Sequence, residues 1–260
     1  MVSKYTPLTD SQWAEISDFF YNDNPYTYEV RDIFDAIRYI TRTGVQWRNL
    51  PDQFPPHDSV YYYYRKWKRN RKLEHINDYL NRLERERETG RETTPSLGLI
   101  DSQSVRLSPM IATARGIDGG KNVNGRKRTI LTDTRGRVWR CEVHAANVAD
   151  AKAGVDLAEP DLKTQMPRLS KVLGDTSYNH IFRLHIEREE GLKYGKSERK
   201  RNTKGFELEV KRWVVERSFS WWNFHRRLVK DYERSPESSE MFVYMANIET
   251  ILNSMHRNET

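Results

Sequence analysis

Cysteine is almost absent from this chain, whose 260 residues include a single one, Cys141. One cysteine excludes an internal disulfide and a cysteine-based zinc cluster, and it fits a reducing compartment. Long apolar runs are also missing: no stretch approaches the roughly 18 consecutive apolar residues of a membrane-spanning helix, and residues 1–7 carry no apolar signal region. The seven histidines lack the clustered spacing of a zinc site. These absences predict a cytoplasmic protein without a membrane partner.

Positive charge exceeds negative charge, and the excess is unevenly placed. The chain has 44 Lys and Arg against 37 Asp and Glu, a formal net charge of +7. Residues 1–95 hold 15 basic and 15 acidic side chains, so the whole surplus falls on residues 96–260. Such an excess suits a polyanionic partner, because phosphate contacts dominate nucleic-acid affinity. Charge alone does not establish that partner, since many ordinary proteins are mildly basic.

The spacing of apolar residues changes along the chain. Residues 8–85 follow helical spacing and begin with a capping box at Thr9–Gln12, whereas short strands alternate with helices after residue 96. We therefore predict three parts: a helical domain over 1–85, a linker over 86–95 and an α/β domain over 96–260. Expected strands cover 97–102, 128–132, 137–144, 169–173 and 191–194, and expected helices cover 150–157, 208–224 and the residues after Ser235-Pro236.

The order of these elements predicts the fold class. Strand, hairpin, helix, strand, helix is the order of a ribonuclease-H-like domain, so we expect an α/β fold with a mixed sheet and helices. A small all-α domain of the helix-turn-helix type would precede it. In the second strand of the hairpin, alternation predicts that Val138 faces opposite to Trp139, Cys141 and Val143.

Three carboxylates stand where a metal-dependent nuclease would need them. Asp101 and Asp175 each close an apolar run, and Glu216 lies inside the helical stretch 208–224. Packed carboxylates raise one another's pKa unless a cation binds them, and hard cations such as Mg²⁺ prefer carboxylate oxygen. Together they suggest two-metal phosphodiester chemistry. Taken singly, each has an ordinary alternative: a turn or helix cap for the aspartates, and a solvated helix face for the glutamate.

Several motifs, in order and over nearly the whole chain, resemble the transposases of small bacterial insertion sequences. The nearest resemblance is to the insertion-sequence-five type, in which a ribonuclease-H-like DDE domain follows a short helical region. The segments that carry this resemblance are Leu99–Val105, Gly119–Arg128, Val143–Asp150, Trp213–Phe219 and Lys230–Ser239.

The resemblance implies a mechanism and a set of partners. Asp101, Asp175 and Glu216 would be the catalytic, metal-binding triad, holding two Mg²⁺ or Mn²⁺ ions per active site. The partner would be double-stranded DNA, both the terminal inverted repeats and the target, bound by a homodimer or a larger assembly. The protein would associate with the bacterial nucleoid when bound to DNA.

Two basic segments are candidate DNA contacts. A helix after residue 58 would carry Arg65, Lys68, Arg69 and Lys72 on one face, as in a recognition helix, and Lys121, Arg126, Lys127 and Arg128 would form a phosphate-binding loop. Each segment has a solvated alternative, a surface helix and a turn before a strand.

The family often carries the pattern Tyr-x₂-Arg-x₃-Glu-x₆-Lys around its glutamate. Arg212 and Glu216 fit this pattern, but Glu209 and Asn223 occupy the Tyr and Lys positions. Arg226 and Arg227, one turn further on, are therefore expected to contribute the phosphate contact in addition to Arg212.

Two alternative functions stay open. One is a ribonuclease-H-like nuclease or junction resolvase that cuts DNA without joining it. The other is a catalytically silent, transposase-derived DNA-binding protein.

Overall fold

The computed structural model describes residues 5–23, 27–159, 162–178, 180–196 and 210–256. Helices come first in the chain: α1 (Asp10–Ala14), α2 (Val30–Thr43), α3 (His57–Arg69) and α4 (Lys72–Glu86), with short 3₁₀ turns at Ser17–Phe20 and Trp47–Asn49. The expected capping box is confirmed, because the Thr9 side chain accepts from the Gln12 amide and the Gln12 side chain accepts from the Thr9 amide.

A six-stranded mixed sheet follows. Its strands are β1 (Leu97–Arg106), β2 (Gly116–Asp118), β3 (Val123–Thr132), β4 (Val138–Ala145), β5 (Lys171–Gly174) and β6 (Lys193–Lys196). The path runs β2-β3-β1-β5-β6, with β4 on β3. β1 pairs antiparallel with β3 but parallel with β5, and β5 pairs parallel with β6. The predicted ribonuclease-H-like α/β class is therefore confirmed.

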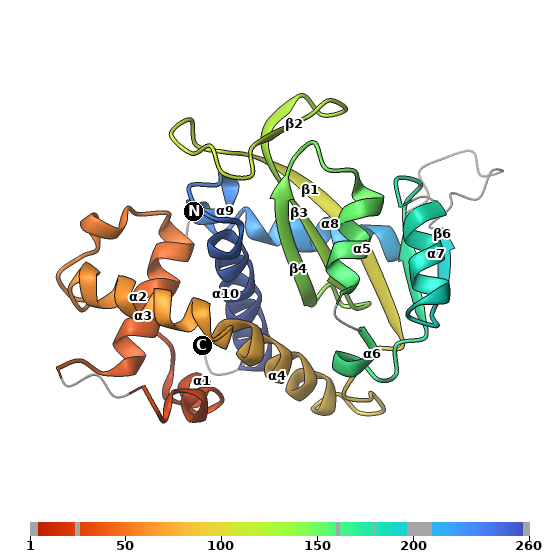
Figure 1. Ribbon diagram of the computed structural model, residues 1–260. Helices are drawn as coiled ribbons and strands as arrows, with labels where there is room; N and C mark the ends of the chain where they lie inside the picture. Colours follow the sequence, from red (N-terminus) through yellow and green to blue (C-terminus); the bar gives the residue numbers. More distant parts are fainter. Residues whose placement is uncertain (1–4, 24–26, 160–161, 179, 197–209, 257–260) are drawn as a thin grey trace.

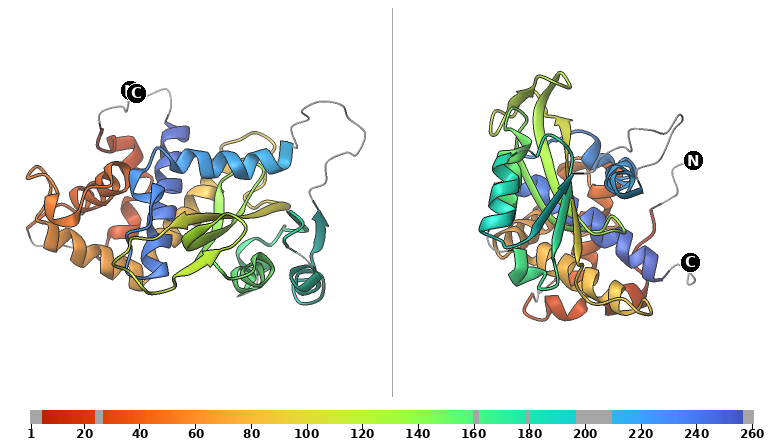
Figure 2. Two further views of the ribbon diagram at one scale, coloured as in Figure 1. Left: turned by 90° about the horizontal axis from the view of Figure 1, so that it is seen from above. Right: turned by 90° about the vertical axis from the view of Figure 1, so that its right-hand side faces the viewer.

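Helices cover both faces of the sheet (Figure 2). One face carries α5 (Asp150–Ala158), the short α6 (Leu162–Gln165) and α7 (His180–Arg188). The other face carries α8 (Val210–Trp222), the short α9 (Arg226–Val229) and α10 (Pro236–Met255). Apolar side chains fall into two clusters, one on each face. As expected, Ser235 caps α10 and Pro236 begins it.

The long helix α10 joins the N-terminal helices to the sheet (Figure 1). It packs against α4 on one side and β4 on the other. One apolar cluster accordingly includes Phe34 and Trp67 from the N-terminal helices, Ile248 from α10 and Leu99 from β1. A buried polar junction reinforces this contact, because the Asn247 side-chain amide donates to the side-chain oxygen Oδ1 of Asn77 at 2.6 Å. The N-terminal helices and the sheet thus share a core, and the domain boundaries proposed above remain a prediction.

One prediction about the hairpin is wrong. Val138 shares its apolar cluster with Cys141 and Val143, while Trp139 packs on the opposite face. The cause is an irregularity in the β3–β4 register: Leu131 pairs with Arg140 and Thr132 pairs with Val138, so β4 holds one extra residue there and its alternation reverses.

Among the described residues, no helix combines the length and the apolar character that crossing a membrane requires.

Candidate active site

Asp101 and Asp175 lie side by side on neighbouring strands. In the parallel β1–β5 pair, Leu97 is opposite Lys171 and Leu99 is opposite Leu173. Extending this register by two residues places Asp175, the first residue after β5, beside Asp101. Side chains two residues apart on a strand share a face, and Leu99 and Leu173 belong to the cluster that includes α8. Both carboxylates therefore face the α8 side of the sheet, and both are half-buried.

Glu216 approaches this face from α8, which packs against β1 (Figure 2). The helix buries Val215, Phe219 and Trp222 against the sheet, whereas Glu216 is exposed. Next to it, the Arg217 guanidinium lies over the rings of Trp213 and Trp221, at 4.7 and 4.8 Å from the ring centroids. The structure thus brings the two aspartates together and places the glutamate on the helix that covers them.

A fourth carboxylate, Asp150 at the start of α5, lies close to this pair. Burial raises the pKa of the Tyr178 hydroxyl, and nearby carboxylates raise it further, in the order Asp101, Asp150 and Asp175. Burial opposes ionisation of Asp150 itself, but hydrogen bonds from Lys127 and Ser102 hold its pKa below its ordinary value. Sequence reasoning missed Asp150, although it ends the segment 143–150 that carried part of the family resemblance.

The donor set suits a hard divalent cation, because it consists of carboxylate oxygens. Within the described ranges, however, no three His, Cys, Asp or Glu side chains lie close enough to form a complete metal site. Glu216 must therefore move toward the two aspartates if all three are to hold one metal centre.

The predicted recognition helix is α3 with the start of α4. Arg65 and Arg69 are exposed there and available to a duplex. Lys68 donates instead to the Ser238 hydroxyl at 3.1 Å, and Lys72 forms an ion pair with Asp23 at 2.5 Å. The ion pair and hydrogen bond place half of this basic group in contacts within the protein.

The predicted phosphate-binding loop needs correction. Residues 123–128 belong to β3, because Gly125 to Arg128 pair with β1 in an antiparallel ladder. Arg126 and Arg128 are 0% and 1% exposed, and Lys127 is 8% exposed. A guanidinium without exposed area cannot contact a duplex, so the structure argues against DNA binding by Arg126 and Arg128. Lys121 is exposed in the turn before β3 and remains a candidate DNA contact.

The basic residues after Glu216 also differ in their exposure to solvent. Arg226 is exposed, whereas Arg227 is buried and pairs with Glu233 at 2.6 Å. The side chain of Arg212 lies outside the described residues.

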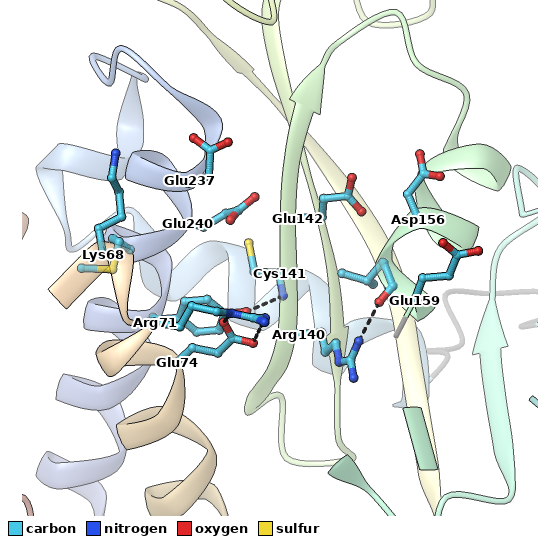
Figure 3. A pocket seen from close by; sticks show the side chains of 13 residues that line it. Lys68, Arg71, Glu74, Arg140, Cys141, Glu142, Asp156, Glu159, Glu237 and Glu240 are labelled. Atoms are coloured by element: carbon cyan, nitrogen blue, oxygen red, sulfur yellow. Dashed lines mark hydrogen bonds and ion pairs between the residues drawn. The ribbon is translucent and has the colours of Figure 1, made fainter. Parts of the chain in front are cut away.

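A cavity of about 370 Å³ lies away from these carboxylates, between β4, α5 and α10 near the α3–α4 junction (Figure 3). Most of its charged lining is acidic, and it includes Glu142 and Glu240. Burial raises the pKa of each of these two glutamates to about 7. A polyanion would be repelled here, so this cavity is not a candidate DNA site.

Two family models match the chain. Residues 8–77 match a domain of unknown function assigned to transposases of the IS4/5 family. Residues 92–250 match the model described as a transposase DDE domain. No curated protein matches the chain.

Proposed function

Because the chain belongs to the transposase DDE domain family, we propose that it binds the terminal inverted repeats of its own insertion sequence. It would cleave those ends and join them to target DNA by phosphoryl transfer. The observation that supports this best is the common face of Asp101, Asp175 and α8. These carboxylates are remote in sequence, yet two lie beside each other at β1 and β5, and the third belongs to the helix that packs on the same face of the sheet.

Divalent metals serve DDE domains in general, and here Asp101, Asp175 and Glu216 would hold a pair of Mg²⁺ or Mn²⁺ ions. Bound there, the metals would activate the attacking oxygen and stabilise the leaving oxygen of an in-line displacement. Asp101, on the central strand β1, would contribute to both positions, and Asp175 and Glu216 to one each. The first aspartate lies in β1, the second directly follows β5, and the glutamate lies on α8.

The N-terminal helices would bind the element ends. Arg65 and Arg69 project from α3, a surface helix whose other face is closed by the buried Tyr64 and Trp67. Phosphate contacts from such residues position a protein on a duplex without specifying sequence. Two ends must meet for joining, so the active form would be a dimer or a larger assembly on DNA.

The first test is cleavage and strand transfer on DNA that carries the native flanks of the gene, with Mg²⁺ or Mn²⁺. We expect Asp101→Asn, Asp175→Asn and Glu216→Gln to abolish cutting while leaving DNA binding largely intact, because each removes a metal-binding charge. Asp156→Asn, an acid paired with Lys152 on the surface of α5, is the matched control.

Each outcome distinguishes a different function. Near wild-type cutting by any of the three variants would refute the triad. Metal-dependent cuts without joined products would favour a nuclease or resolvase. Specific binding without cutting by the wild-type protein would favour a silent DNA-binding relative.

A further inference from the structure

Asp150 begins α5 on the face of the sheet opposite to α8, and it bonds to side chains of β1 and β3. Its Oδ1 accepts from the Ser102 hydroxyl at 2.8 Å and from the Lys127 ammonium at 3.0 Å. The same ammonium donates to the Val148 carbonyl at 3.1 Å. The Ser177 hydroxyl donates to Asp175 Oδ1 at 2.5 Å, and it lies close enough to Asp150 to help lower the pKa of that carboxyl. We call Ser102, Lys127, Asp150 and Ser177 the Asp150 network.

The members of this network adjoin the catalytic positions. Ser102 follows Asp101 on β1, and its backbone amide donates to Asp101 Oδ1 at 2.7 Å. Ser177 lies two residues after Asp175, and its amide donates to Asp175 Oδ1 at 2.8 Å. Asp150 therefore connects, through one serine each, to the residues that fix both carboxylates.

Alternation along the strands makes this connection possible. Asp101 points toward α8, so Ser102 points toward α5, where Asp150 begins the helix. Lys127 is the β3 partner of Ser104, two residues beyond Ser102, and therefore shares its face. The side chains of Lys127 and Asp150 are 10% and 19% exposed. A largely buried ion pair of this kind keeps its geometry better than an exposed one, because less water competes for its atoms.

We propose that the Asp150 network positions the Asp101 and Asp175 carboxylates for metal binding, with Lys127 serving this network rather than DNA. This inference rests on the proposed function. Asp150 is a positioning residue here, since its contacts reach the serines beside the two aspartates. Outer partners of metal ligands typically change metal affinity or activity by about 10–100-fold when they are removed.

The test compares wild type with Asp150→Asn, Lys127→Met and Lys127→Arg. Mn²⁺ affinity is measured directly by electron paramagnetic resonance of the free ion. The Mn²⁺ concentration for half-maximal cleavage is measured in parallel, and urea unfolding reports folding. We expect Asp150→Asn and Lys127→Met to weaken Mn²⁺ binding by about tenfold or more. The cleavage rate at saturating Mn²⁺ should largely recover, and Lys127→Arg should retain most of the affinity because it keeps the charge.

Asp156→Asn is again the matched control, because it removes an aspartate of the same helix that pairs with Lys152 and is not a member of the Asp150 network. Unchanged Mn²⁺ affinity in a folded Asp150→Asn protein would overturn the proposal. If Asp150→Asn does not fold, Ser102→Ala removes a single hydroxyl from the network, and unchanged affinity in that variant would overturn it equally.

The experiment also separates a failure of the proposed function from a failure of the Asp150 network. A wild-type protein that neither binds Mn²⁺ nor cuts would refute the metal-dependent activity, and the role of the network with it. A wild type that cuts, together with an Asp150→Asn variant that behaves identically, would refute only the network.

Discussion

Arg126 is expected to stabilise the fold through its buried ion pair with Asp231 and to make no contact with DNA. In a basic run beside glycines it resembles a phosphate contact, but in the structure it is 0% exposed. Its guanidinium pairs with Asp231 at 3.3 Å and donates to the carbonyls of Glu233 at 2.8 Å and Thr113 at 2.7 Å. Asp231 is itself 0% exposed on its side chain. Arg126 therefore ties β3 to the segment that leads into α10.

Replacing Arg126 with methionine keeps an unbranched apolar stem and removes the charged guanidinium. Breaking a buried pair in this way typically costs about 3–5 kcal/mol, because the remaining charge stays buried without its partner. For a chain of this size, about 2–4 °C of melting temperature is lost per kcal/mol, so a decrease of roughly 6–20 °C is expected. Urea unfolding followed by tryptophan fluorescence measures the free energy directly.

The salt dependence of DNA binding distinguishes the buried Arg126 from an exposed arginine that contacts DNA. Arg126→Met should leave the slope of log affinity against log salt unchanged. The exposed Arg65→Met should lower that slope by about 0.9, one phosphate contact, with a stability change within roughly 0.5 kcal/mol. Adding Asp231→Leu to Arg126→Met should recover part of the lost stability, since both buried charges are then gone. An Arg126→Met protein of wild-type stability with a reduced salt slope would refute this reasoning and restore the phosphate-contact interpretation.

Two further predictions concern buried titratable groups around the acidic cavity. Burial raises the pKa of Glu240 from 4.5 to about 7, so the folded state favours the protonated form, and stability is lost as pH rises through that range. The free energy of unfolding of wild type relative to Glu240→Gln should therefore fall between pH 4.5 and 7, and a difference independent of pH would contradict this. The Cys141 thiol is 8% exposed and burial raises its pKa, so iodoacetamide should label it slowly in native protein and rapidly in urea. Rapid native labelling, seen by mass spectrometry, would show that the thiol is accessible.

The sequence by itself determined the order of the elements and the candidate carboxylates. Helical and strand spacing are local, so they predicted the hairpin, the strand before Asp175 and the helix around Glu216 without knowledge of partners. The separation of 74 residues between Asp101 and Asp175 equals the offset of the parallel β1–β5 register, from Leu99 to Leu173. The acid at the end of β5 was therefore visible before the sheet was known, whereas Asp101 proved to lie inside β1, which continues to Arg106.

Tertiary structure alone decided which charges are exposed and which are internal. Arg126 and Arg65 are both arginines in basic runs, yet one is buried by the segment before α10 and the other is exposed on α3. The burial of Arg126 depends on Asp231, 105 residues away. Trp139 lies on the face opposite to Cys141 because the β3–β4 register is irregular. Asp150 lies near the serines beside the two aspartates because α5 begins on the other face of the sheet. Such contacts join residues remote in the chain, and local spacing contains no information about them.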